Sequence, residues 1–476
     1  MSRLFSVALV LVLSIPLAEA AAPAEDLPAP IAQVLRQQGL SKRGLSIFVQ
    51  QVGQAEPLLT LNADTPRNPA STMKLVTTLA ALEELGPAYT WKTEAWATAP
   101  VRDGVLNGDL YIKGYGDPYL VIEHFWRFLR ALRKAGLQTI RGDLVIDQSY
   151  FEPVSGRPAD FDHRPLRAYN VQPRALLVNF QAVNFRFLPQ PGTQRVQIVA
   201  DPQPAQLAID NRVHLTQGPC RGGARGLGMR VAQQGGLQKL VFSGRYSNDC
   251  GDDSYYRVVT GPDSYTYGVF KSLWTELGGQ FAGSMREGTV PEGAQLLHVT
   301  QSPSLAEIIR DVNKYSNNVM TRQILLTLGA EKFGPPGTVD KGSAAVHAWL
   351  AQKGLSFPEL ALDNGSGLSR DGRISARHLG EILLTAWQSP YMPEFLASLP
   401  ILSMDGTLAH RSGGALAGRA HLKTGSLDNV RAQAGIVLDE HGRRVVMVIL
   451  HNDARAESAA GEAVQNALLA WIANRP

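Results

Sequence analysis

Three short motifs in the chain could together make a serine hydroxyl attack a carbonyl carbon. They are Ser71-Thr72-Met73-Lys74, Ser316-Asn317-Asn318 and Lys423-Thr424-Gly425, and each pattern occurs once. A serine hydroxyl is a weak nucleophile until a neighbouring base takes its proton. In the first motif a lysine follows the serine by one helical turn, so its amine can reach the hydroxyl.

Each polar residue of the motifs has a chemical role to fill. Lys74 is the candidate base, and burial or a nearby cation would have to lower its pKa so that it loses its proton near neutral pH. Lys423 is a candidate for that cation, and it could also hold a substrate carboxylate. Ser316 could relay a proton to a leaving amine. Asn318 offers an amide that can bind a peptide carbonyl.

The negative charge that develops on an attacked carbonyl oxygen needs hydrogen-bond donors. The backbone N–H of Ser71, at the predicted start of a helix, and that of Ser426, on a following edge strand, could form such an oxyanion hole. Each motif also has a purely structural interpretation. Ser71 could be only an N-cap, Ser316 could cap a helix that begins near Val319, and Lys423 could be a solvated strand residue. The three motifs together, in this order, favour the catalytic interpretation.

Other kinds of chemistry find little support in the sequence. The chain has no Gly-x-Ser-x-Gly, no His-Glu-x-x-His and no phosphate-binding Gly-rich loop, and its 10 histidines lack ligand spacing. A zinc hydrolase or a Ser-His-Asp hydrolase is therefore disfavoured. The formal net charge is +4 with no dense run of Lys or Arg, which disfavours nucleic-acid binding. A mildly basic chain could still help to attract an acidic polymer at low salt.

Hydrophobic periodicity predicts the elements that would position these residues. A helix over 71–85 carries the first motif, and helices over 305–313 and 319–328 flank the second. A strand pair over 432–438 and 444–451 directly follows the third. Further predicted elements are a strand hairpin over 45–52 and 58–61 and helices over 121–135, 267–277, 344–353, 376–387 and 459–473, the last packed on a sheet.

The N-terminal residues are typical of a secretory signal peptide. Arg3 precedes a nearly apolar stretch over 4–17, and residues 18–20 fit a small-x-small cleavage site. We expect a signal peptide over 1–20. The alternative is a membrane anchor, but this stretch is short for a span of about 20 residues. No other stretch is long and apolar enough to cross a bilayer, so we expect no membrane span after cleavage.

The 476 residues are too many for one compact core, and the motifs are unevenly spaced. The first and second motifs are 245 positions apart, whereas the second and third are 107 apart. We therefore expect inserted material between the first two motifs. Residues 179–256 have the pattern of short strands separated by turns. They contain both cysteines, Cys220 and Cys250, which suggests one disulfide in an exported chain; two buried thiols or a metal pair are the alternatives.

On these residues the chain resembles the class C penicillin-binding proteins of the D-Ala-D-Ala carboxypeptidase/endopeptidase type, peptidase family S13, whose DacB-type members are called penicillin-binding protein 4. The motif order and the long first gap carry the resemblance. The resemblance also includes the stretches 69–74, 108–110, 363–370, 405–408 and 423–427. The resemblance covers essentially the whole mature chain.

The resemblance implies an α/β (α+β) fold. A serine β-lactamase/DD-peptidase-like catalytic domain, with a β-sheet flanked by helices, would comprise 21–87 and 291–476. Two nested domains would be inserted into it. The first would comprise 88–179 and 258–290, and the inner, β-rich one would comprise 180–257.

The resemblance also implies a reaction. Ser71 would attack the D-Ala-D-Ala carbonyl of a peptidoglycan stem peptide, and water would hydrolyse the acyl-enzyme. The same site would cut D-Ala–diaminopimelate cross-links, and β-lactams would acylate the serine as covalent inhibitors. No metal or organic cofactor is implied, and the enzyme would act in the periplasm.

A further set of residues would contact the substrate by the same resemblance: Thr424, Gly425, Ser426, Tyr169, Asp162 and Arg370. In the family an aromatic and an acidic residue of the inserted domain lie near the substrate amine. Tyr169 fits the aromatic. The family's spacing places the acid near Arg164, so that Asp162 is the nearest candidate, and Asp428 is a weaker candidate for substrate contact.

Two other functions stay open at this point. A β-lactamase would need a group that hydrolyses the penicilloyl-enzyme fast, and the sequence identifies none. A penicillin-binding sensor would be acylated but would hardly turn over, and intact motifs are compatible with it.

Overall fold

Four β-sheets organise the part of the chain that the computed structural model describes, residues 27–234 and 237–475. The main lobe has a five-stranded antiparallel sheet with the strand order β18 (Ala420–Leu427), β19 (Val430–Leu438), β20 (Arg444–Asn452), β1 (Leu45–Gln51) and β2 (Leu59–Leu61). Strand β18 is therefore an edge strand of the sheet. Residues 400–402 bond to the first half of its outer edge, through Leu402 N–H to Ala420 and Leu422 N–H to Pro400.

Helices cover both faces of this sheet because apolar side chains alternate between the faces of its strands. Ile47 and Ile449 face α1 (Ala29–Gln38) and α10 (Ala459–Ala473). Phe48 and Val448 face the opposite cluster of helices. These helices are α2 (Lys74–Leu85), α5 (Leu305–Lys314), α6 (Asn318–Phe333), α7 (Val339–Gln352), α8 (Ala376–Gln388) and α9 (Met392–Ser398).

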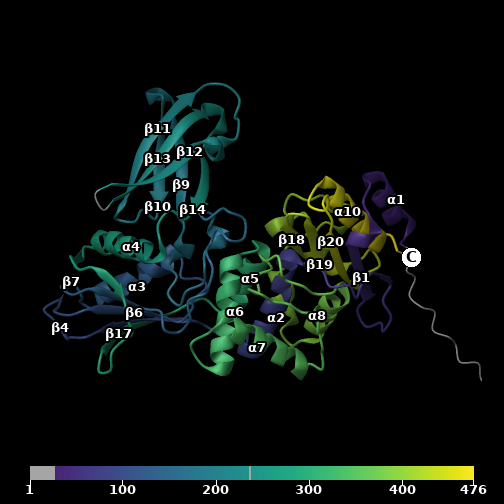
Figure 1. The fold of residues 1–476 in the computed structure, drawn as a ribbon, viewed down its shortest axis with the longest axis horizontal. Coiled ribbons are helices and arrows are strands. Elements are labelled where there is room, and N and C mark those ends of the chain that lie inside the picture. The colour runs from purple at the N-terminus through teal and green to yellow at the C-terminus, as the bar shows by residue number, and fades with distance from the viewer. Residues whose placement is uncertain (1–26, 235–236, 476) are drawn as a thin grey trace, which may run out of the picture.

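A second lobe joins two small sheets to two helices, α3 (Ile122–Lys134) and α4 (Pro262–Glu276) (Figure 1). One sheet has the order β16 (Met285–Glu287), β8 (Leu144–Asp147), β6 (Leu110–Gly114), β3 (Lys92–Ala97) and β17 (Gln295–Gln301). The other has the order β15 (Gln280–Phe281), β7 (Thr139–Ile140), β5 (Val105–Leu106) and β4 (Val101–Arg102).

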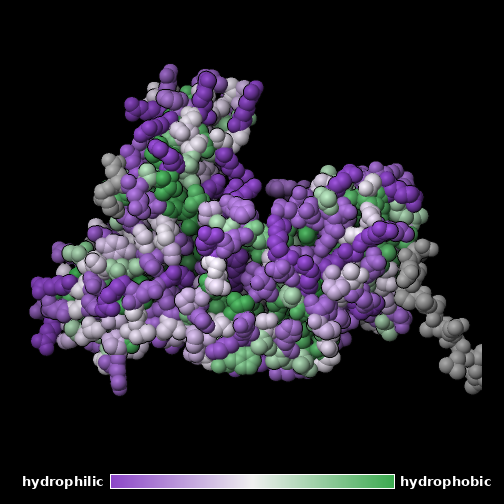
Figure 2. All heavy atoms as spheres, in the orientation of Figure 1, coloured by the Kyte–Doolittle hydropathy of each residue, from purple (hydrophilic) through white to green (hydrophobic). Residues whose placement is uncertain are grey.

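A third lobe is built on one six-stranded sheet. Its order is β12 (Gly228–Gln234), β13 (Leu237–Ser247), β11 (Leu207–Thr216), β10 (Arg195–Asp201), β9 (Val183–Gln190) and β14 (Asp253–Arg257). Phe185, Phe187 and Phe242 are buried against one face of this sheet, in a hydrophobic cluster that continues into the second lobe. Figure 2 shows that the surface is hollowed between the third lobe and the main lobe, with mostly hydrophilic side chains on both sides of the hollow.

The fold is a mixed α/β arrangement, as predicted, and most predicted elements lie within a few residues of their observed bounds. The helix predicted over 267–277 begins earlier, at Pro262, because the fixed φ of proline suits the first turn of a helix. The helix predicted from Ser71 begins as a 3-10 turn over Ala70–Met73 and becomes α-helical at Lys74. Helix α1 was not predicted.

The predicted domain boundaries remain a proposal. Strand β17 pairs with β3, so the sheet of the second lobe continues past residue 290, where we predicted that the first inserted segment ends. The predicted signal peptide over 1–20 lies outside the described residues. Among the residues that are described, no helix is long and apolar enough to cross a membrane.

Cys220 and Cys250 form a disulfide, 30 positions apart, in the third lobe. A cross-link that closes a loop of this size stabilises by about 3–4 kcal/mol on the chain-entropy model. We expect the Cys220→Ala/Cys250→Ala variant to lose about that much stability in the third lobe, measured by limited proteolysis of residues 180–257 in urea. The motifs lie in the main lobe, so labelling of the protein by fluorescent penicillin, if it occurs, should persist. Equal protease resistance of variant and parent would contradict the expected contribution.

Candidate active site

The three motifs, far apart in sequence, meet where β18 passes the N-terminal end of α2. Ser71 lies in the 3-10 turn that leads into α2, and Lys74 is the first residue of α2. The second motif spans the link from α5 to α6, with Asn318 as the first residue of α6. Lys423 lies on the edge strand β18. Three separate elements thus supply the polar groups of one site.

The amine of Lys74 has three oxygen neighbours. Its Nζ lies 3.0 Å from Ser71 Oγ, 2.5 Å from Asn318 Oδ1 and 2.6 Å from the backbone oxygen of Ser366. The Lys74 side chain is 0% exposed, and no carboxylate of the described residues forms an ion pair with it. The amide oxygen and the backbone carbonyl can only accept hydrogen bonds, so the amine donates to both.

The surroundings of Lys74 favour its neutral form. Burial lowers the pKa of Lys74 well below its usual value, and the positive charges of Lys423 and Arg322 lower it further. A neutral amine has two N–H groups and one lone pair. The two N–H groups are used by Asn318 and Ser366, and the lone pair is left for the hydroxyl proton of Ser71.

Lys423 is the second fully buried amine of the site. Its Nζ donates to Ser316 Oγ and to the backbone oxygen of Thr424, both at 2.9 Å. Burial lowers the pKa of Lys423 to about 7. Near neutral pH this amine is therefore close to its point of half-protonation, and it can exchange a proton with the hydroxyl of Ser316. The Thr424 hydroxyl lies 2.8 Å from that of Thr407.

Ser316 occupies a strained backbone position. Its φ is +58°, in the left-handed region that glycine usually fills after a helix. The structural alternative for this serine is wrong, because the side chain of Asn317 accepts the capping hydrogen bond from the Met320 N–H at the start of α6. A strained serine that does not cap the helix is what a functional position would show.

The edge strand approaches the turn with the serine very closely at Gly425. A Cβ on Gly425 would lie 2.8 Å from the Pro69 backbone oxygen and 2.9 Å from the Ser71 backbone nitrogen. Any side chain there would push β18 away from the turn. The close approach places the backbone of β18, with the exposed Ser426 next along the strand, beside the N–H of Ser71.

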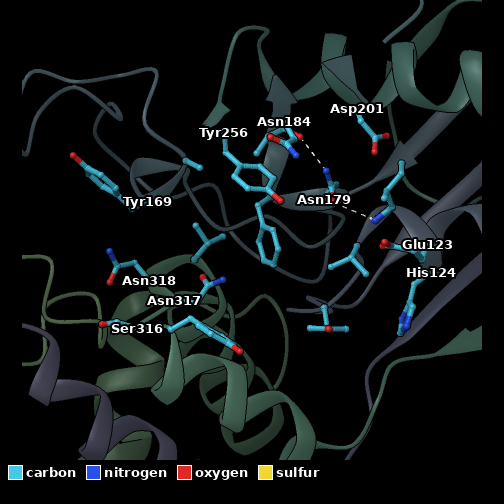
Figure 3. Close-up of a pocket in the computed structure, with 18 of the residues that line it drawn as sticks. Glu123, His124, Tyr169, Asn179, Asn184, Asp201, Tyr256, Ser316, Asn317 and Asn318 are labelled. Carbon is cyan, nitrogen blue, oxygen red and sulfur yellow. Dashed lines mark hydrogen bonds between the residues drawn. The ribbon is translucent and has the colours of Figure 1, made fainter. Parts of the chain in front are cut away.

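A cleft of about 740 Å³ runs from Ser316 and Asn318 toward the six-stranded sheet. Figure 3 shows these two residues on one side and Tyr256 and Asn184 on the opposite side, with Tyr169 at one end. Tyr169 therefore lies in the cleft beside the second motif, and its contact with a substrate amine remains a prediction. Neither Ser71 nor Lys74 lines this cleft, which begins beside them at the second motif.

Asp162 does not line the cleft. Its carboxylate accepts hydrogen bonds from the Tyr169 hydroxyl at 2.6 Å, from Asn170 Nδ2 at 2.8 Å and from the Arg164 N–H at 3.0 Å. These donors lower the pKa of Asp162 against the opposing effect of burial. The acid thus orients Tyr169, and the geometry gives no support to direct contact of Asp162 with a substrate amine.

Arg370 does not line this cleft. Its Nη2 is 2.5 Å from Asp428 Oδ2, and its guanidinium stacks 4.8 Å from the centre of the Phe161 ring. It lines a second cleft of about 600 Å³, which also includes Arg322. The ion pair with Asp428 ties this cleft to the turn that follows the third motif.

Sequence reasoning missed two groups that act on Lys74. The backbone oxygen of Ser366 accepts a hydrogen bond from its amine, and a carbonyl has no sequence signal of its own. Arg322 is buried one turn along α6, and burial lowers its pKa to about 10. A buried arginine on a helix is visible only once the packing is known. Among the described residues no group of His, Cys, Asp and Glu could hold a metal ion.

Comparison with known proteins gives one consistent result. Residues 27–475 match the family model described as the D-Ala-D-Ala carboxypeptidase 3 (S13) family. The chain is 29% identical to a D-alanyl-D-alanine carboxypeptidase of Actinomadura sp. (strain R39), over 94% of this chain and 84% of that protein. It is 25% identical to the D-alanyl-D-alanine carboxypeptidase DacB of Haemophilus influenzae, over 85% of this chain and 84% of that protein.

The fold is also that of a solved relative. The crystal structure of penicillin binding protein 4 (dacB) from Haemophilus influenzae superposes with a TM-score of 0.75 at 23% identity, covering 92% of this chain and 98% of that one. The same protein complexed with a novel β-lactam superposes with a TM-score of 0.71 over the same shares.

The strain and the chemistry of Ser316 can be separated by two variants. Ser316→Gly and Ser316→Ala both remove the hydroxyl that accepts from Lys423, so both should lower the acylation rate of Ser71 by about 10²-fold or more. Only glycine relieves the left-handed backbone, so Ser316→Gly should be more stable than Ser316→Ala by about 1 kcal/mol, measured by thermal unfolding. Full activity in the glycine variant would show that the hydroxyl has no chemical role.

Proposed function

Because the chain belongs to the D-Ala-D-Ala carboxypeptidase 3 (S13) family, we propose that Ser71 is its nucleophile and Lys74 the base that activates it. The protein is a serine-type D-Ala-D-Ala carboxypeptidase of the DacB type. Three finer properties belong to the proposal. The enzyme also cleaves D-Ala–diaminopimelate cross-links of peptidoglycan, β-lactams inhibit it by acylating Ser71, and it acts in the periplasm after cleavage of its signal peptide.

The environment of the Lys74 amine is the observation that carries this proposal. A protonated amine has three N–H groups and no lone pair, and it could not accept a proton. Here the amine is buried among two obligate acceptors and one hydroxyl, with a second buried lysine nearby. A protonated amine could also donate to all three neighbours, since a hydroxyl can accept, but burial without a carboxylate and the nearby cations disfavour that form. The neutral amine fits them with its two N–H groups on the two acceptors and its lone pair on the hydroxyl of Ser71.

Acylation follows from this arrangement. Lys74 takes the hydroxyl proton as Ser71 Oγ forms a bond to the carbonyl carbon of the penultimate D-Ala. The resulting oxyanion would be held by the N–H groups of Ser71 and Ser426, and the close approach of β18 to the Ser71 nitrogen at Gly425 supports this assignment. These donors are part of the backbone and need no reorganisation during the reaction.

The leaving amine needs a proton before the C–N bond breaks. Ser316 and Lys423 form the pair that can deliver it, since the hydroxyl accepts a hydrogen bond from an amine whose pKa is about 7. The proton that Lys74 took from Ser71 can then replace the one that Ser316 and Lys423 gave to the leaving amine. Water then attacks the acyl-enzyme, with Lys74 again as the base, and Ser71 is released with its proton restored.

Substrate binding would use groups that the resting network leaves over. Asn318 uses its Oδ1 for Lys74, so its Nδ2 is left to donate to a substrate carbonyl. Beyond Leu422, where residues 400–402 no longer bond to it, the outer edge of β18 can pair with an extended peptide. In its protonated form Lys423, together with Thr424 and Ser426, can bind the terminal carboxylate of a D-Ala-D-Ala peptide.

Cross-link cleavage is supported by the cleft of about 740 Å³ next to Ser316, which offers room for a larger leaving group than D-Ala. Inhibition by β-lactams is supported by the similar fold of a relative that was solved in complex with one. The periplasmic location rests on the predicted signal peptide.

The proposal is tested with purified mature protein, cross-linked muropeptides and a fluorescent penicillin. We expect release of free D-Ala, cleavage of muropeptide dimers and a long-lived penicillin label. The Ser71→Ala variant should lose about 10⁴-fold or more of each activity and keep its fold by circular dichroism. Ser254→Ala, an exposed serine of β14, is the matched control and should behave like the parent.

Each other outcome contradicts part of the proposal. Rapid turnover of penicillin would indicate a β-lactamase, and stable labelling without muropeptide cleavage would indicate a sensor. Release of D-Ala without cleavage of muropeptide dimers would contradict the proposed endopeptidase activity. Labelling of a folded Ser71→Ala protein would remove Ser71 as the nucleophile.

A further inference from the structure

One face of the six-stranded sheet is strongly basic. Strand register places six cationic side chains on the face opposite the buried phenylalanines. Arg195, His214 and Arg245 form one row across β10, β11 and β13. The six cations, one to two on each of five strands, are Arg186, Arg195, Arg212, Arg230, Lys239 and Arg245. We call these six residues the basic face.

Few acids compensate this charge. Asp210 lies on the same face, and it is shared by Arg212 and Lys239 in two ion pairs. Asp201 lies on this face only at the end that reaches the cleft. The arginines at positions 186, 195, 230 and 245 are exposed, and within the described part of the chain no ion pair engages them. Their charge is therefore open to an outside partner.

The charge of the whole chain is concentrated in this lobe. Residues 180–257 contain nine Lys and Arg and five Asp, which is a net charge of +4. The formal net charge of all 476 residues is also +4, so the remainder of the chain is neutral. A lobe that carries the entire excess of positive charge can attract a polyanion even when the protein as a whole is only mildly basic.

The basic face is continuous with the cleft of the candidate active site. Residues two apart on a strand share a face, so Asn184 lies on the same face as Arg186 on β9. Tyr256 on β14 is the cross-strand partner of Asn184. Both Asn184 and Tyr256 line the cleft opposite Ser316 (Figure 3). A chain lying on the basic face can therefore reach the cleft without crossing another element of the sheet.

The proposed substrate has the complementary charge. A peptide that ends in D-Ala-D-Ala carries a free carboxylate at its terminus, and a polymer with many such stem peptides is a polyanion. Exposed arginines bind carboxylates through paired N–H donors. The polymer is also too large for the cleft, so the stem peptides next to the one being cut must lie on the surface around it.

We propose that the basic face is a docking surface for carboxylate-bearing stem peptides of polymeric peptidoglycan, which holds the enzyme on the polymer while one stem peptide enters the cleft. This inference rests on the proposed function. It assigns binding of the polymer to the third lobe and the chemical reaction to the main lobe.

The test compares polymer with small substrate. The variant Arg186→Gln/Arg195→Gln/Arg245→Gln removes three charges from the basic face. Its control, Arg36→Gln/Lys42→Gln/Arg102→Gln, removes three exposed charges elsewhere. Retention on purified sacculi is measured by sedimentation in the Ser71→Ala background, and cleavage of a D-Ala-D-Ala pentapeptide is measured with Ser71 intact.

We expect the basic-face variant to bind sacculi about tenfold more weakly than the control, and to cleave the pentapeptide at the control's rate. Amidation of the sacculus carboxylates, or added salt, should weaken binding of the parent protein and leave binding of the basic-face variant nearly unchanged. Equal retention of the two variants would overturn the proposal, as would parent binding to anionic lipid vesicles but not to sacculi.

Failure of the proposed function would look different. A parent protein that binds sacculi through the basic face but cleaves neither pentapeptide nor muropeptide dimers would refute the proposed function and leave the docking surface standing. Cleavage of the pentapeptide with unaltered sacculus binding in the basic-face variant would refute the docking surface and leave the proposed function standing.

Discussion

The site depends on an amine that is buried without a counter-charge. Lys74 lies in the core with oxygen neighbours that carry no formal charge, beside a second buried lysine. Placing an ammonium ion there would cost several kcal/mol, because no carboxylate compensates its desolvation. A neutral amine avoids this cost, and the lowered pKa of Lys74 favours that form. The neutral amine is also the form that can take a proton from serine, so one constraint accounts for both the structure and the reactivity of the site.

The rest of the main lobe can be understood as the means of holding that amine. Helix α2 brings it to Ser71, the first residue of α6 supplies Asn318, and Gly425 lets the edge strand close over the turn. The strained backbone at Ser316 brings a hydroxyl to Lys423 where a glycine would relax the chain. The long insertion between the first two motifs contributes Tyr169 and the opposite wall of the cleft, and through its six-stranded sheet it offers a charged surface beside the chemistry.

The sequence was most informative where chemistry restricts residue type. Ser71, Lys74, Ser316 and Lys423 could be predicted because few residues can do their work, and the helices and strands that carry them have clear periodicity. Groups that act through position alone could not be predicted. The backbone oxygen of Ser366 has no side-chain signature, and the hydrogen bond from Tyr169 to Asp162 depends on how their loop folds, which the sequence pattern does not show. The basic face needed strand register, since its six cations are scattered over sixty residues of sequence.

The charge state of Lys74 in the resting enzyme is the most direct test of this account. Lysine labelled with ¹³C at Cε reports protonation of its amine through its chemical shift, and loss of one resonance in Lys74→Met assigns it. Because the folded state lowers the pKa of Lys74, we predict that its resonance is that of a neutral amine at neutral pH and shifts only as the pH falls. A resonance that stays protonated until about pH 10.4, as for a free lysine, would contradict the account.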